Sequence, residues 1–191
     1  MSDLFGEDLN GAEIVGKYRR TLWRTVNAAG TGEAAFIGLN PSDADAERND
    51  PTVRRECGFT YRWGCRRYWK LNLHDYRTPS PAVLKRAAVP TWTPENDAAI
   101  ARVLARTGVR IVVAAWGNDG PWQGRDERVE AIVHAAGHRL VCLALTGAGH
   151  PRHTLARGVH RIPDTAEPRE WRRPLVTASA TGLVGEDVEE V

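Results

Sequence analysis

Short apolar segments separated by mixed polar segments dominate the chain. Residues 34–39, 68–73, 111–115 and 139–145 are largely apolar, and polar or glycine-rich residues follow each of them. A strand that is buried on both faces, as in a parallel sheet, has such a nearly continuous apolar run. The pattern therefore predicts four central strands, and the period-two alternation over residues 18–26 predicts a further strand before them.

The segments between these strands have the start signals of helices. Asp50 followed by Pro51 is a good cap and first helical residue, which predicts a helix to about Trp63. Helices are also expected over residues 81–88, from residue 93 to about 104, and over residues 123–136. Alternating strands and helices predict a three-layer α/β/α sandwich around a four-stranded parallel sheet.

The length and composition fit one globular domain. The chain has 191 residues, of which 42% are apolar and 26% charged. We expect an N-terminal extension over residues 1–16, the domain over residues 17–163, and a flexible C-terminal tail over residues 164–191, which is rich in Pro, Arg and Glu. No apolar run is long enough to span a bilayer and no signal peptide is visible, so we expect a cytoplasmic protein without a membrane partner.

Cysteine and basic residues narrow the chemistry. Cys57, Cys65 and Cys142 form no CxxC pair and are too few for an iron–sulfur cluster, so we expect reduced thiols and no such cluster. All but three of the 26 basic residues are arginine, whose planar fork suits phosphate, although a GC-rich coding sequence would give the same bias. The net charge of +2 does not by itself require a nucleic acid partner. We expect a monomer.

The four central strands end in distinctive residues. In chain order these are Asn40-Pro41-Ser42, Asn72, Trp116-Gly117-Asn118 and Gly149-His150-Pro151. Parallel strands place their carboxyl ends at one edge of the sheet, where ligands bind in α/β proteins. The sequence therefore predicts that the four ends surround one cleft.

These ends resemble the motifs of the uracil-DNA glycosylase superfamily. That superfamily has a Gly-x-Asp/Asn-Pro loop, a base-reading Asn, a strand ending in Trp-Gly, and a His-Pro loop, in this order. The chain also resembles a bacterial family described only as a domain of unknown function, through Asn40-Pro41-Ser42, Asp50-Pro51-Thr52 and Pro151-Arg152-His153. The resemblance implies a uracil-DNA glycosylase-like fold and a cofactor-free, monofunctional DNA glycosylase, which flips out a base and hydrolyses its N-glycosidic bond.

The resemblance also implies catalytic roles. Asn40 would orient the attacking water, Asp45 or else Asp43 would supply a carboxylate, and His150 would donate to the departing base. No lyase step is expected, because no lysine is well placed and Lys70 is expected to face the surface.

Three further residues are expected at the base. Asn72 would read it, Phe59 would stack on it, and Ser42 stands where strict uracil enzymes carry a Tyr that excludes substituents on pyrimidine carbon five. The open wall at Ser42 predicts a damaged or modified, 5-substituted pyrimidine, such as a hydroxymethylated or glucosylated base of phage DNA. Both DNA repair and antiphage defence are compatible with this substrate.

Five cationic residues are candidates for contacts with DNA phosphates. They are Arg54, Arg55, Arg77, Arg152 and His153.

Each candidate also has an ordinary structural explanation. Asn40 before a proline could close a turn, Phe59 could be a core residue, and Asn72 could form a structural hydrogen bond. Two other functions stay open, namely hydrolysis or transfer on free nucleosides or nucleotides, and DNA binding without turnover. A metal site made by Asp45, Asp50, His150 and His153 matches no ligand motif, so no metal is expected.

Overall fold

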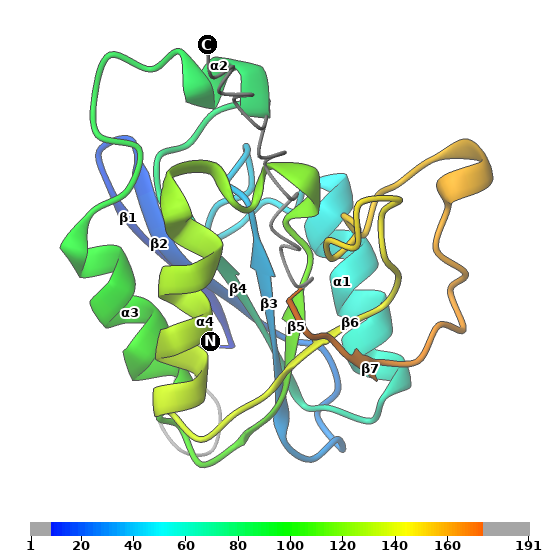
Figure 1. Cartoon of the computed structure of the whole chain (residues 1–191). Helices are drawn as coiled ribbons and strands as arrows, with labels where there is room; N and C mark the ends of the chain where they lie inside the picture. The colour runs from blue at the N-terminus through cyan, green and yellow to red at the C-terminus, as the bar shows by residue number, and fades with distance from the viewer. Residues whose placement is uncertain (1–8, 174–191) are drawn as a thin grey trace, which may run out of the picture.

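A seven-stranded mixed sheet with helices on both faces forms the protein (Figure 1). The computed structural model describes residues 9–173. Within them the strands are β1 (Asn10–Val15), β2 (Tyr18–Thr25), β3 (Glu33–Gly38), β4 (Arg67–Asn72), β5 (Val109–Ala114), β6 (Leu140–Cys142) and β7 (Arg169–Glu170). The α-helices are α1 (Pro51–Arg62), α2 (Pro81–Lys85), α3 (Pro94–Leu104) and α4 (Arg125–Ala135).

The order of strands is β1-β2-β4-β3-β5-β6-β7. β4, β3, β5 and β6 run parallel, whereas β1, β2 and β7 pair antiparallel at the two sides. The sheet is thus seven-stranded and mixed instead of the four-stranded parallel sheet expected. The four expected central strands are all present, and each differs from its predicted range by a few residues at most.

The central strands bury both faces, which explains their continuous apolar runs. On β3, Ala35 and Ile37 belong to the core beneath α3 and α4, while Ala34 and Phe36 belong to the core beneath α1. Because alternate side chains of a strand point to opposite faces, each face receives its own apolar set. Figure 1 shows α3 and α4 in front of one face and α1 behind the other.

The helices begin where the sequence predicts. Asp50 caps α1 by accepting a 2.8 Å hydrogen bond from the backbone N–H of Val53, and Pro51 follows as the first helical residue. Thr93 caps α3 in the same way, through its hydroxyl and the N–H of Asn96. These caps stabilise helices whose apolar faces then pack on the sheet.

The terminal segments contribute more to the fold than the sequence predicts. Residues 10–15, expected in an extension, form the edge strand β1. Residues 169–170, expected in a tail, form β7, and the adjacent Trp171 is 4% exposed and packs edge-on against Trp116. These strands are short, so local pattern does not distinguish them from loops. The rest of the predicted tail, residues 174–191, lies outside the described residues, and within residues 9–173 no helix is long and apolar enough to cross a membrane.

Candidate active site

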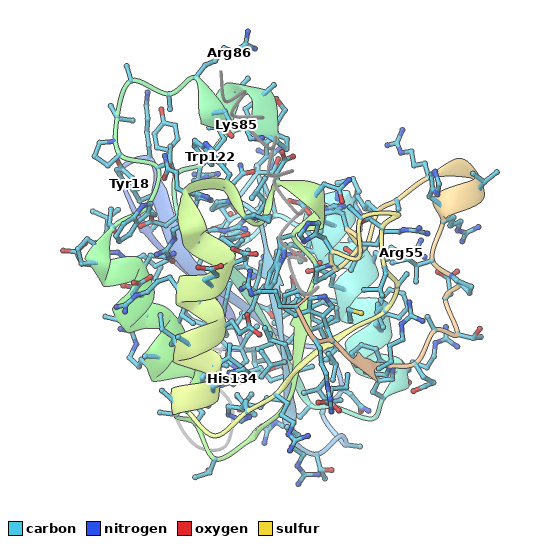
Figure 2. All side chains as sticks on the ribbon, viewed as in Figure 1. Tyr18, Arg55, Lys85, Arg86, Trp122 and His134 are labelled. Atoms are coloured by element: carbon cyan, nitrogen blue, oxygen red, sulfur yellow. The ribbon has the colours of Figure 1, made fainter. Side chains whose placement is uncertain are left out.

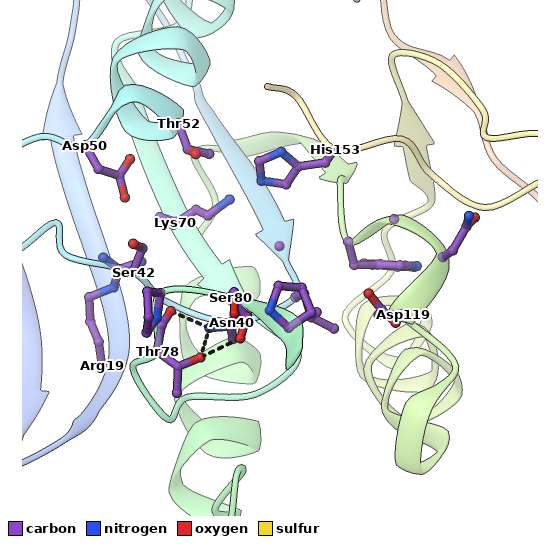
Figure 3. Close-up of a pocket in the computed structure, with 17 residues that line it drawn as sticks. Arg19, Asn40, Ser42, Asp50, Thr52, Lys70, Thr78, Ser80, Asp119 and His153 are labelled. Carbon is purple, nitrogen blue, oxygen red and sulfur yellow. Dashed lines mark hydrogen bonds between the residues drawn. The ribbon is translucent and has the colours of Figure 1, made fainter. Parts of the chain in front are cut away.

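One cavity of about 380 Å³ opens at the carboxyl ends of the parallel strands (Figure 3). Its volume lies in the usual range for small-molecule sites, roughly 300–1,000 Å³. The wall is formed by residues 38–40 and 42, the first turn of α1, residues 78–81, residues 116–119, and the side chains of Arg19, Lys70 and His153. The residues that line the cavity therefore include residues at the carboxyl ends of β3 and β5, one residue of β4, and one residue of the loop after β6.

The carboxamide of Asn40 has a fixed orientation at this cavity. Its Nδ2 donates to the carbonyl of Thr78 at 3.0 Å, to the hydroxyl of Thr78 at 2.9 Å and to the carbonyl of Pro41 at 3.1 Å. Because two of these acceptors are carbonyls, the nitrogen must face them. Oδ1 is then the acceptor that a ligand or water in the cavity can use.

Asp45 does not line the cavity, whereas Asp50 and Asp119 do, and Asp119 pairs with Lys85 at 2.5 Å. Asp45 accepts hydrogen bonds from the backbone N–H groups of Glu47, at 2.9 Å, and Arg48, at 2.8 Å, and these bonds lower the pKa of its carboxyl. It closes a turn and does not line the cavity, and Asp43 is exposed outside it. Asp50 lines the cavity, and its carboxylate also accepts the hydrogen bond that caps α1.

Lys70 lies inside the protein, so the expectation that it faces the surface is wrong. The residue is 4% exposed, and its Nζ contacts both carboxylate oxygens of Glu56 at 3.0 Å. Glu56, fully buried on α1, also accepts from the hydroxyls of Tyr68 at 2.6 Å and Thr154 at 2.9 Å. Burial, the negative charge of Glu56 and the hydrogen bond from the Tyr68 hydroxyl to Glu56 raise the pKa of Tyr68 well above its usual range.

A glycine leaves room for polar groups beneath the cavity. A Cβ at Gly38 would lie 2.8 Å from Nζ of Lys70 and 3.2 Å from Oδ1 of Asn72. Asn72 is fully buried, and neither its Oδ1 nor its Nδ2 has a hydrogen-bond partner among residues 9–173. A buried amide without partners is costly. Asn72 lies behind Gly38 and does not itself line the cavity.

Arg19 is a second buried cation at the cavity. It is 1% exposed, and its Nη1 donates to the carbonyl of Ala44 at 2.8 Å. Its Nε has no hydrogen-bond partner among the described residues, and no carboxylate there lies within ion-pair distance. Burial is the largest influence on this guanidinium and lowers its pKa.

His153, and not His150, reaches the cavity. Nδ1 of His153 accepts a hydrogen bond from the N–H of Leu155 at 3.2 Å, so the neutral ring carries its proton on Nε2. Although the residue keeps access to solvent, loss of water around the ring and the nearby charge of Lys70 lower the pKa of His153. His150 does not line the cavity, and its Nδ1 is buried without a partner in the described part of the chain.

The loops that follow β5 and β6 are joined to each other. The N–H of Gly117 donates to the carbonyl of Pro151 at 2.8 Å, and Gly117 adopts a φ of 74°, which favours glycine. Trp116 and Gly117 line the cavity, with Trp116 itself 2% exposed. The Trp-Gly and His-Pro segments are therefore neighbours, as expected for strand ends on one edge.

Phe59 does not lie at the cavity. It is 2% exposed in the core beneath α1, with its ring stacked on Trp63 at a centroid distance of 5.8 Å. The apolar face of α1 packs on the sheet, which turns Phe59 inward.

The four predicted phosphate-binding arginines also lie outside the cavity wall, and all four contact backbone carbonyls. Arg55 contacts the carbonyl of Ile162 and pairs with Asp164 at 3.0 Å. The other acceptors are the carbonyl of Asn49 for Arg54, those of Ser42 and Asp43 for Arg77, and that of His160 for Arg152. Arg54 is the exposed member of this set.

Sequence reasoning missed Arg19 and Lys70 because polar residues in a strand are normally assigned to its solvated face. A signal for Lys70 was present, because it interrupts an apolar run directly opposite a strand that ends in Gly38. Arg19 has no comparable signal. Within residues 9–173 no group of three or more His, Cys, Asp or Glu side chains is placed to hold a metal ion.

The fold and the cavity define an α/β protein with a cavity lined by polar side chains at the carboxyl edge of its parallel strands. The model of the family described as "Protein of unknown function (DUF1643)" matches residues 19–155, and the chain belongs to that family. The match includes every cavity residue from Arg19 to His153. No curated protein and no solved structure matches the chain.

Proposed function

We propose that this protein is a monofunctional DNA glycosylase that removes a modified pyrimidine and leaves an abasic site. One observation carries the proposal: Asn40, Trp116-Gly117 and a histidine of the His-Pro loop line the same cavity. These segments are far apart in the chain, and their order resembles that of the uracil-DNA glycosylase superfamily. The parallel arrangement of β4, β3, β5 and β6 supports the same comparison.

Attack by water is assigned to Asn40 and Asp50. The Thr78 contacts hold the Asn40 amide so that Oδ1 is free to accept a hydrogen bond from the water. Asp50 replaces Asp45 as the carboxylate, because it lines the cavity. A carboxylate there favours the positive charge that develops on the sugar in the transition state.

Stabilisation of the departing base is assigned to His153 instead of His150. A neutral His153 donates from Nε2 to a base oxygen, and its lowered pKa keeps it neutral near pH 7. The ammonium of Lys70 adds a fixed positive charge. Because Lys70 is engaged by both oxygens of Glu56, it is not a free nucleophile, and no lyase step is proposed.

Substrate choice is assigned to Ser42 and Asn72. Ser42 lines the cavity, and its small side chain leaves space for a substituent on pyrimidine carbon five. Asn72 offers one donor and one acceptor without partners in the described structure, which suits the edge of a base. The proposed substrates are therefore 5-substituted pyrimidines in DNA.

The test uses duplex and single-stranded DNAs that carry uracil, 5-hydroxymethylcytosine or its glucosylated form. After incubation, heating in alkali reveals abasic sites as strand breaks. We expect breaks with a 5-substituted base, and about a 10²- to 10³-fold loss of rate in Asn40→Ala, the scale for removing one positioned polar group from an active site. Asn10→Ala, at an exposed position on β1, is the matched control and keeps the wild-type rate. Equal products from wild type and Asn40→Ala would contradict the proposal.

Hydrolysis of a free nucleotide is the second candidate. The observation that favours it is the buried guanidinium of Arg19 in an enclosed cavity, which suits a small phosphorylated ligand. Release of base from a deoxynucleotide, with none from DNA that carries the same base, would select this alternative.

A further inference from the structure

Arg19 has a single hydrogen bond in the described structure, which distinguishes it from three other buried cations. Arg24 also has no carboxylate partner there, but its Nε, Nη1 and Nη2 all donate to neutral acceptors. Lys70 pairs with both oxygens of Glu56, and Arg125 pairs with Asp97 at 2.6 Å. Arg19 is as deeply buried as these residues, but its one hydrogen bond within residues 9–173 goes to a neutral carbonyl. An ionised group without a counter-ion in the interior is unfavourable, and an anionic ligand would offset this cost.

The free part of the guanidinium has the geometry that oxyanions prefer. Nη1 is used by the carbonyl of Ala44, whereas Nε and Nη2 form no hydrogen bond with a described residue. Adjacent N–H groups of a guanidinium bind two oxygens of a phosphate or carboxylate in parallel. In Arg19 the edge formed by Nε and Nη2 is thus free to bind such an anion, while the hydrogen bond from Nη1 fixes the position of the guanidinium.

Thr52, Arg77 and two carboxylates lie around Arg19 or in the same cavity wall, and one of these carboxylates, Asp119, is paired with Lys85. Thr52, in the first turn of the twelve-residue α1, lines the cavity with its hydroxyl and lies at the positive end of the helix dipole. Arg77 is close enough to lower the pKa of Arg19. Asp50 faces the same cavity, but its carboxylate caps α1 and is not within ion-pair distance of Arg19.

We propose that Arg19 and Thr52 form an anion subsite that binds a phosphate group of the substrate inside the cavity. Which molecule carries this phosphate rests on the proposed function. If the protein is a DNA glycosylase, the group is a backbone phosphate next to the flipped nucleotide. If the substrate is a free nucleotide, the group is the phosphate of that nucleotide. The subsite itself requires only the cavity and the unpaired guanidinium.

Direct binding tests the subsite without requiring turnover. Calorimetric titration of inorganic phosphate into the full chain, at constant ionic strength, should show binding to wild type. Arg19→Met should bind about 10- to 100-fold more weakly, the effect of losing one or two charge-assisted hydrogen bonds. Arg139→Met is the matched control, because Arg139 is exposed and outside the cavity. Asp50→Asn should bind phosphate more tightly, because an opposing charge is removed.

A second measurement needs no variant. In ¹⁵N-labelled wild-type protein the Nε–H signal of Arg19 should shift on addition of phosphate and should not shift with chloride at equal ionic strength. Equal phosphate binding by wild type and Arg19→Met, or an Arg19 signal that phosphate leaves unchanged, overturns the subsite.

The carrier is identified by comparing deoxycytidine, its 5′-monophosphate and a short single-stranded DNA. An effect of Arg19→Met on DNA binding assigns the backbone phosphate, whereas an effect on the monophosphate alone assigns the free nucleotide. Arg19-dependent phosphate binding with no abasic sites keeps the subsite and overturns the glycosylase proposal. If wild type and Arg19→Met form abasic sites equally and bind phosphate equally, the glycosylase proposal stands and the subsite is overturned.

Discussion

Two buried cations line the cavity, and their surroundings differ. Lys70 is held by Glu56, whose carboxylate also accepts from Tyr68 and Thr154, so every charge in that network has a partner. Arg19 has one hydrogen-bond acceptor, the carbonyl of Ala44, and no carboxylate partner among the described residues. All three ionisable side chains are buried, with Arg19 1%, Lys70 4% and Glu56 0% exposed. Figure 2 shows the side chains of the described residues on the ribbon.

This difference indicates that the charge of Lys70 serves the stability of the fold, whereas the charge of Arg19 serves ligand binding. Removing one partner of a buried ion pair leaves an uncompensated charge, whereas a cation that is already unpaired has no such partner to lose. Changes at the Lys70 network should therefore act mainly on folding. Changes at Arg19 should act mainly on binding.

The largest expected effect follows removal of Glu56. Glu56→Ala leaves Lys70 buried without its counter-ion and should lower the free energy of unfolding by about 3–5 kcal/mol. Urea denaturation followed by circular dichroism measures this loss, with the exposed Glu95→Ala as the control. The double variant Glu56→Ala/Lys70→Met should recover part of the stability, because the unpaired charge is then gone. A single-variant loss below about 1 kcal/mol would contradict a structural ion pair.

A tyrosine at position 42 should change selectivity by a smaller amount. Ser42→Tyr places a ring at the cavity wall and should reduce the rate on 5-substituted pyrimidines about 10- to 100-fold relative to uracil, the scale of one steric contact in a pocket. Competition between two labelled DNAs in one reaction measures the ratio. An unchanged ratio would show that this wall does not face carbon five. Ser2→Tyr, outside the matched family segment, serves as control.

Arg19→Met should hardly change stability, in contrast to Glu56→Ala. Loss of the Ala44 hydrogen bond is offset by removal of a buried unpaired charge, so the free energy of unfolding should change by no more than about 1 kcal/mol. The same urea titrations provide the measurement. A loss as large as that of Glu56→Ala would mean that Arg19 is a structural residue.

The smallest effect is expected from pH. In the proposed mechanism His153 acts in its neutral form, and loss of water around the ring lowers its pKa below 6.5, so activity should fall in acid with a midpoint below pH 6.5. Initial rates from acid to neutral pH measure the profile. A midpoint at or above pH 6.5 that disappears in His153→Gln would contradict the proposed role.

The strands and helices could be predicted because their signals are local. The apolar runs of β3 to β6 and the caps Asp50 and Thr93 specify elements without knowledge of their neighbours. The choice of side chains that enter the cavity depends on tertiary packing. The sequence indicates a helix cap for Asp50 and does not show that the same side chain lies in the cavity wall, whereas Asp45, the expected carboxylate, closes a turn.

The same limit applies to the histidines and to the strand cations. His150 and His153 share one loop, and only the folded path of that loop brings His153 to the cavity. Lys70 and Arg19 occupy strand positions that a period-two pattern assigns to either face. In the structure Lys70 is buried against Glu56 of α1, and Arg19 is buried with its Nη1 on the carbonyl of Ala44. A sequence pattern thus located the edge of the sheet, while the structure selected the groups at that edge.

The source of the oxygen at the sugar tests the central claim most directly. DNA with 5-hydroxymethylcytosine or its glucosylated form is incubated with the protein in H₂¹⁸O, quenched at once with sodium borohydride so that the abasic sugar cannot exchange oxygen afterwards, and examined by mass spectrometry. The account predicts released base, ¹⁸O on the reduced abasic sugar, and neither product with Asn40→Ala. Absence of released base, or a protein–DNA adduct fixed by borohydride through Lys70, would contradict it.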